Sequence, residues 1–300
     1  MVTTYDYRMV LGPHSPVPMP LQRLLAANRT LLHDVGTEFP KVQMHRKTMA
    51  NTLGLLTDGM PDQTAHENYL KMVLEHKDSG CIVYSYGAFL SSRKNALRAG
   101  VLYPSLEKKI APLRRLTDGQ RVTVFLCLQH FTQFIELELK RSPHLRHLVD
   151  SYPHSLDFSW VHFVCRMRAA WPEALFVILD AENLAVNWAA TVALITGHPD
   201  THTFKNIEEF PVSCLAENGR ASYLQALKAS PPQTVPEWTA ITSRFFSEYG
   251  SHVPIIRKVI ASPWSSNQIE HSKQKYEADL VNLRALDNVI MSSDVEWAEQ

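Results

Sequence analysis

The sequence predicts an α/β protein with a mostly parallel central sheet flanked by helices. Four short runs are almost continuously apolar, as expected for strands that are buried on both faces of a parallel sheet. Helical patterns lie between these runs and the connections are short, which favours alternating strands and helices in one sheet. The predicted strands are residues 7–11, 81–86, 121–128 and 174–180.

The first predicted helix follows the first strand after a proline-rich loop. Its leucines share one helical face, Pro20 suits the first turn of a helix, and Gly36 stands just beyond its end. Further helices are predicted at 64–77, 105–116 and 131–141, and the last of these directly follows a strand.

The C-terminal third, about residues 205–290, is predicted to be mainly helical. Segment 230–238 contains three prolines and is typical of a loop, whereas about 237–249 and about 265–286 have amphipathic patterns. We interpret these helices as cover for the sheet. On this interpretation residues 1–300 form one α/β domain.

Composition and charge narrow the class of partner. The 300 residues are 45% hydrophobic and 20% charged, and 30 basic side chains balance 30 acidic ones. A chain without net positive charge lacks the general attraction to nucleic acids or anionic membranes, so neither partner is expected. The four cysteines are widely spaced, and no apolar run resembles a signal peptide or a membrane span. We therefore expect a cytoplasmic protein.

The 14 histidines raise the question of a metal site. His144 and His147 are three residues apart, and His198 and His202 are four apart. Neither pair belongs to an H-E-x-x-H motif or to a cysteine and histidine cluster with ligand-like spacing. Scattered surface or capping histidines explain the number, and no metal is expected.

The segments that follow the predicted strands are expected to hold the functional residues. In open parallel sheets ligands bind at the carboxyl ends of the strands, and a loop running into a helix offers N–H groups to an anion. These segments are 12–22, 85–92, 129–136 and 180–188.

The first of these segments, "GPHSPVPMPLQRLLAANR" at 12–29, carries a family resemblance. It resembles the first loop of bacterial sulfotransferase-like proteins of the P-loop fold, typically G-x-H-K-T-G-T-T-x-L-Q-x-x-L-x-x-N-R. Segments 89–113, 156–174 and 263–289 are also similar to related members. The resemblance implies the P-loop fold over residues 7–290, and a site for the donor 3′-phosphoadenosine-5′-phosphosulfate. The matching residues of the first loop are Gly12, His14, Leu21, Gln22, Leu25, Asn28 and Arg29.

The centre of this loop lacks the residues that hold the donor in the family. Ser15 stands at the position of the lysine, and Pro16, Val17, Pro18 and Met19 replace the Thr-Gly-Thr-Thr that wraps the 5′-phosphate. A proline has no N–H and fixes φ near −65°, so two donors are removed. The left-handed turn that glycine permits is unfavourable at Val17. The loop is therefore expected to bind no phosphate.

A second group of family positions has also changed. Gln129 stands where an arginine holds the 3′-phosphate, and Glu136 stands near the position of a serine. A neutral amide replaces a bidentate cation, and a carboxylate repels phosphate. The resemblance also implies an acidic residue after the second strand, which many members of that family carry as a candidate general base, but Gly87 stands where a glutamate is expected. Three separate regions thus point to a lost donor site.

Other residues after the strands remain pocket candidates. His130 is the candidate for a catalytic base, although the start of an inert helix and a pocket for a neutral ligand are equally compatible with this segment. Ser85 stands at the carboxyl end of the second predicted strand. Glu182 matches an acidic residue of the relatives, and it also suits a helix cap or a structural hydrogen bond.

Two functional hypotheses follow. The first is a sulfotransferase-like protein with a degraded donor site that needs no cofactor and acts as a non-catalytic binding or scaffolding protein. It would bind a different small molecule or a protein partner, including a second copy of the chain in a homo-oligomer. The second is an active sulfotransferase or other group transferase with a rebuilt donor site, which would use the phosphosulfate donor. Fold alone cannot choose between them, because function depends on the site.

Overall fold

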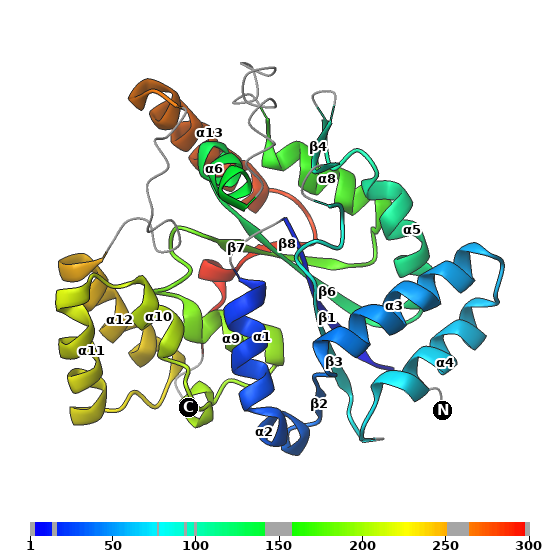
Figure 1. The fold of residues 1–300 in the computed structure, drawn as a ribbon, viewed down its shortest axis with the longest axis horizontal. Coiled ribbons are helices and arrows are strands. Elements are labelled where there is room, and N and C mark those ends of the chain that lie inside the picture. Colours follow the sequence, from blue (N-terminus) through cyan, green and yellow to red (C-terminus); the bar gives the residue numbers. More distant parts are fainter. Residues whose placement is uncertain are drawn as a thin grey trace.

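The computed structural model describes residues 4–13, 17–76, 78–92, 95–98, 101–141, 158–250 and 264–297. Six strands form one sheet in the order β2-β3-β1-β6-β7-β8, and every neighbouring pair is parallel. Helices pack on both faces of this sheet (Figure 1). The predicted α/β class with a mostly parallel sheet is confirmed.

The four predicted strands are present with nearly the predicted bounds, because each is a continuous apolar run buried in the sheet. They are β1 (Asp6–Gly12), β3 (Cys81–Ser85), β6 (Arg121–Leu128) and β7 (Leu175–Asp180). Two short strands extend the sheet at its edges, and two others form a separate antiparallel pair. These additional strands are β2 (Thr37–Glu38), β8 (Val289–Met291), β4 (Leu97–Arg98) and β5 (Val101–Leu102).

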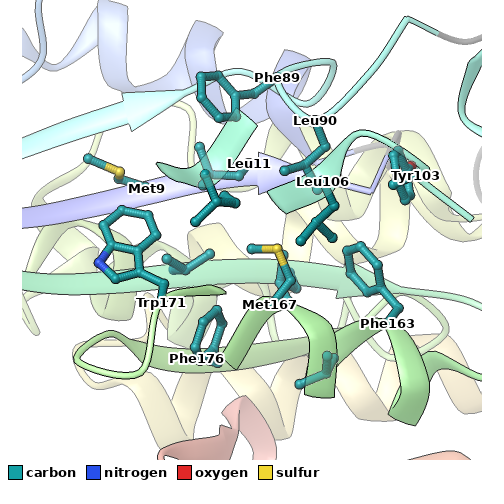
Figure 2. Close-up of a cluster of buried hydrophobic side chains, with 14 of the residues drawn as sticks. Met9, Leu11, Phe89, Leu90, Tyr103, Leu106, Phe163, Met167, Trp171 and Phe176 are labelled. Carbon is teal, nitrogen blue, oxygen red and sulfur yellow. The ribbon is translucent and has the colours of Figure 1, made fainter. Parts of the chain in front are cut away.

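Alternation along β1 distributes its side chains between two buried clusters. Tyr7, Met9 and Leu11 face the first cluster, and Val10 faces the second. Figure 2 shows part of the first cluster, in which Met9 and Leu11 lie among side chains from several helices and loops. The helices of this face are α3 (Val42–Thr57), α4 (Asp62–Val73), α5 (Leu106–Leu116), α6 (Phe131–Arg141), α8 (Trp160–Ala170) and α13 (Ser266–Arg284).

The opposite face carries the remaining helices, including most of those in the C-terminal third. Val10, Val83, Phe125 and Val177 of the sheet share one buried cluster with them. These helices are α1 (Pro18–Ala27), α2 (Arg29–Asp34), α9 (Trp188–Thr196), α10 (Glu209–Cys214), α11 (Glu217–Ala229) and α12 (Val235–Tyr249). Short 3-10 turns lie at η4 (Thr201–Thr203) and η5 (Ser292–Asp294).

The first predicted helix is broken in two at Asn28. This residue has φ −117° and ψ 24°, and its side chain is buried. Its Nδ2 donates to the carbonyls of Leu24 at 2.8 Å and Lys205 at 3.0 Å, and its Oδ1 accepts from the Lys205 N–H at 2.8 Å. The polar side chain thus ties the break between α1 and α2 to a distant loop.

Among the described residues, no helix combines the length and the apolar character needed to cross a bilayer. All four cysteines are among the described residues, and none of them forms a disulfide.

Candidate functional site

The sheet has a topological switch point beside β1. The chain runs from β1 to β2 and β3 on one side, and then crosses to β6 on the other side. At such a point the connections leave the carboxyl ends of neighbouring strands in opposite directions, and a crevice for ligands commonly results. The strands beside this point end at Gly12, Ser85 and Leu128, and β7 ends at Asp180.

The loop after β1 begins at Gly12 and leads to Val17, the residue before α1. Gly12 has φ 122°, a conformation that side chains disfavour, which explains why glycine stands there. His14, Ser15 and Pro16 lie outside the described residues. Val17, at the other end of the loop, is completely buried.

The N-terminus of α1 offers few free N–H groups. Pro18 and Pro20 occupy the first and third positions of the helix, and neither has an N–H. The Leu21 N–H already donates to the Val17 carbonyl at 3.1 Å. Met19 is therefore the one residue of the first three helical positions whose N–H can reach an external anion. The N-cap residue, Val17, has no polar side chain that could cap this terminus.

The segment after β3 packs directly against this helix start. A Cβ atom added at Gly87 would lie 2.8 Å from Cγ of Pro18, so the two residues are in tight contact. One turn further along α1, Gln22 Nε2 donates to the carbonyl of Ser85 at 2.9 Å and to its hydroxyl at 3.1 Å. The start of α1 and the end of β3 are thus in direct contact. A glutamate at position 87 would collide with Pro18.

The segment after β6 holds Gln129 and His130. Gln129 is 3% exposed, and its backbone carbonyl accepts from the indole N–H of Trp160 at 2.7 Å. His130 directly precedes α6, and its carbonyl accepts from the Phe134 N–H at 3.1 Å. Glu136 lies in the second turn of α6 and is half-buried. The two positions compared with a phosphate site, 129 and 136, thus offer a buried amide and a carboxylate in place of a cation.

The side chain of His130 caps α6. Its Nδ1 lies 3.3 Å from the Gln133 N–H and 2.8 Å from the Thr132 hydroxyl. Because a backbone N–H can only donate, Nδ1 is an acceptor here, and the proton of the neutral ring is on Nε2. Burial lowers the pKa of His130 to about 4, and the positive charge of Lys273 acts in the same direction. The ring is therefore neutral near pH 7 with its one basic nitrogen occupied.

Glu182 and Asp180 lie near this ring, at the end of β7. Glu182 Oε1 is 3.6 Å from His130 Nε2, and its carboxylate is 43% exposed. Asp180 accepts from the Glu182 N–H at 3.1 Å and from Asn183 Nδ2 at 2.7 Å. The Tyr276 hydroxyl lies 2.7 Å from Asp180 Oδ1, and burial raises the pKa of Tyr276 far above its usual value. These contacts line a polar cleft of about 350 Å³.

A larger cleft of about 820 Å³ opens at the carboxyl end of β3, on the opposite face of the sheet from α1. It lies between α3, α5 and the segment that follows β3. Apolar and aromatic side chains form most of its described walls, three cations line it, and no acidic side chain is among the described residues that do so. The lining residues are Arg46, Met49, Ala50, Leu53, Gly54, Thr57, Tyr84, Tyr86, Ala88, Phe89, Ser91, Ser92, Lys108, Lys109 and Pro112.

Arg46 lies against the aromatic wall of this cleft. Its guanidinium carbon lies 4.4 Å from the centroid of the Tyr86 ring, which is a cation–π contact. Its Nε is buried and has no hydrogen-bond partner among the described residues. A buried N–H without an acceptor costs about 1–3 kcal/mol, so an acceptor from a ligand would be favoured here.

The sequence predictions did not include this cleft. Its α3 wall has a helical repeat, since Arg46, Met49, Leu53 and Thr57 recur every three or four residues. That periodicity could have indicated a helix with one distinct face, but it could not show that this face of α3 lines a cleft.

Comparisons with models of protein families, with curated proteins and with solved structures found no match for this chain. The fold and site define a three-layer α/β protein with a parallel six-stranded sheet, a close contact between the start of α1 and the segment after β3, and an open cleft at the carboxyl end of β3.

Proposed function

We propose that this chain is a non-catalytic ligand-binding protein with a sulfotransferase-like P-loop fold and a lost site for 3′-phosphoadenosine-5′-phosphosulfate. The observation that carries the proposal is the start of α1, where two of the first three positions are prolines and Pro18 packs on Gly87. Phosphate binding at a helix start depends on several converging N–H groups. The order of the strands around β1 is compatible with the fold proposed.

Binding of 3′,5′-bisphosphoadenosine, the product of the donor, tests the loss of this site. We expect no thermal shift and no calorimetric heat with up to about 1 mM nucleotide. At this concentration even weak specific sites are largely occupied. Saturable binding with a Kd below about 100 μM would refute the proposal and favour the alternative, a group transferase with a rebuilt donor site.

We place the ligand in the cleft between α3 and α5. Its aromatic and aliphatic walls suit an apolar body, and Arg46, Lys108 and Lys109 suit an anionic group. The proposed ligand class is an amphipathic anion, in which a carboxylate, sulfate or sulfonate is attached to an aromatic or aliphatic group. Because none of the cysteines forms a disulfide, a reducing compartment such as the cytoplasm is part of this proposal.

The dye 8-anilinonaphthalene-1-sulfonate is a suitable probe, since it joins an aromatic body to a sulfonate. We expect saturable binding of one dye per chain, weakened about tenfold by Arg46→Gln, because a hydrogen bond to a charged group contributes about 1.5–3 kcal/mol. Arg23→Gln is the matched control, since Arg23 is exposed on α1, across the sheet. The neutral analogue N-phenyl-1-naphthylamine should bind at least about tenfold more weakly. Equal affinities for both dyes, or for both variants, would contradict the assignment of the cleft.

A further inference from the structure

Three side chains with metal-binding atoms meet outside the clefts described above. His33 lies in the last turn of α2, Glu38 is in the edge strand β2, and His76 follows α4. Glu38 pairs with Ile82 near the amino end of β3. The turn that brings His33 towards Glu38 contains Gly36 at φ 72°, a left-handed conformation that suits glycine.

The donor atoms of this cluster are close to the spacing around a metal ion. His33 Nε2 lies 3.2 Å from Glu38 Oε1, His76 Nδ1 lies 3.9 Å from Glu38 Oε2, and all the donor atoms lie within 4.8 Å of one another. Ligands at 2.0–2.2 Å from a tetrahedral zinc ion are roughly 3.3–3.6 Å apart. The imidazole rings are also adjacent, with centroids 3.9 Å apart. Small side-chain movements would bring the three atoms onto one ion.

The carboxylate of this cluster is buried and held in a fixed orientation. The side chain of Glu38 has no exposed surface. Its Oε2 accepts from the backbone N–H of Glu75 at 3.0 Å and of His76 at 3.3 Å. Hydrogen bonds of this kind orient the ligands of metal sites. A buried carboxylate is costly unless its charge is compensated, and histidine supplies a full positive charge only when it is protonated.

We propose that His33, Glu38 and His76 bind one divalent transition-metal ion, with zinc as the principal candidate. Two imidazoles and one carboxylate are a donor set that zinc accepts, and the cation would compensate the buried charge of Glu38. The side chain of His76 is 54% exposed, so the site opens to solvent and water can fill the fourth position. The ion would connect α2, β2 and the segment after α4. This site is independent of the ligand proposed for the large cleft, because none of its three residues lines that cleft.

Calorimetric titration of the tag-free full chain with zinc at pH 7.5 tests this proposal. We expect one zinc ion per chain with a Kd of about 1 μM or lower, and at least about thirtyfold weaker binding in His76→Ala and in His33→Ala. At a concentration a hundredfold above its Kd for the unsubstituted chain, zinc should raise the melting temperature of that chain by about 5 °C and that of His76→Ala by less than about 2 °C.

Two controls separate the site from incidental binding and from misfolding. His202→Ala removes an exposed histidine in another region and should leave zinc binding unchanged. His76 is largely exposed, so its replacement should preserve the circular dichroism spectrum of the chain. A Kd weaker than about 100 μM for the unsubstituted chain, or equal zinc affinity in all three variants, would overturn the proposal. In either case the cluster is a hydrogen-bonded structural group only.

Discussion

The contact between Pro18 and Gly87 leads to a quantitative prediction for Gly87→Ala. The new Cβ would lie 2.8 Å from Cγ of Pro18, closer than carbon atoms normally approach, and Cγ belongs to a buried ring at the start of α1. Overpacking of this kind costs about 1–3 kcal/mol. Replacing glycine by alanine at a permitted backbone conformation returns about 0.4–1 kcal/mol through the unfolded state. We therefore expect a net loss of about 1–2 kcal/mol in the free energy of unfolding.

A double-mutant cycle with Pro18→Ala isolates this contact. Alanine at position 18 removes Cγ and leaves only Cβ, which lies 3.7 Å from the position of the new Cβ at residue 87, an ordinary contact distance. In the Pro18→Ala background, Gly87→Ala should be neutral or slightly stabilising, so the coupling free energy is about 2 kcal/mol. Urea unfolding of the four proteins, followed by circular dichroism, measures it. A coupling below about 0.5 kcal/mol would refute the close packing of the loop after β3 against α1.

Three other predictions concern polar contacts. The first is that His130→Gln removes a pH dependence of the free energy of unfolding. The pKa of His130 is about 4 in the folded chain and about 6.5 in the unfolded chain, so the unfolded chain binds more protons between these two pH values. The free energy of unfolding of the unsubstituted chain therefore falls as the pH decreases from 6.5 to 4. The difference in free energy of unfolding between the unsubstituted chain and this variant should fall by at least about 1 kcal/mol from pH 7.5 to pH 4.5, and a constant difference would contradict the burial of this ring. Tyr276→Phe, which removes the hydroxyl 2.7 Å from Asp180, should cost about 1–2 kcal/mol in urea unfolding, whereas no cost would mean that solvent replaces this contact. Asn28→Ala should cost about 2 kcal/mol and increase protease cleavage near Lys205, because three hydrogen bonds are lost; unchanged stability and cleavage would show that the break between α1 and α2 does not depend on them.

The sequence was sufficient to predict the strands and helices that have a strong apolar pattern. The long strands are continuous apolar runs, and α5 and α6 are amphipathic, so their bounds were predicted to within one residue. Helix α3 was missed because its buried face includes His45, Thr48 and Thr52, which interrupt the apolar stripe. Helix α9 was missed for the opposite reason, since it is apolar and buried almost all round and has no polar face.

The sites could be predicted only in part, because they depend on contacts between distant segments. The prolines at the start of α1 indicate lost N–H donors from the sequence alone. That Pro18 meets Gly87 follows from the pairing of β3 with β1, which no local pattern specifies. The same applies to His33 and His76, which are 43 residues apart and meet only because β2 pairs with β3. The predictions for His14, Ser15 and Pro16 lie outside the described residues.

The most direct test of the proposed function is one calorimetric comparison on a single preparation of the chain. The chain is titrated first with 3′,5′-bisphosphoadenosine and then with 8-anilinonaphthalene-1-sulfonate. We predict no heat of binding for the nucleotide, and a saturable heat with one site per chain for the sulfonate, reduced in Arg46→Gln. Binding of the nucleotide with a Kd below about 100 μM would contradict the loss of the donor site. Absence of sulfonate binding would contradict the ligand cleft.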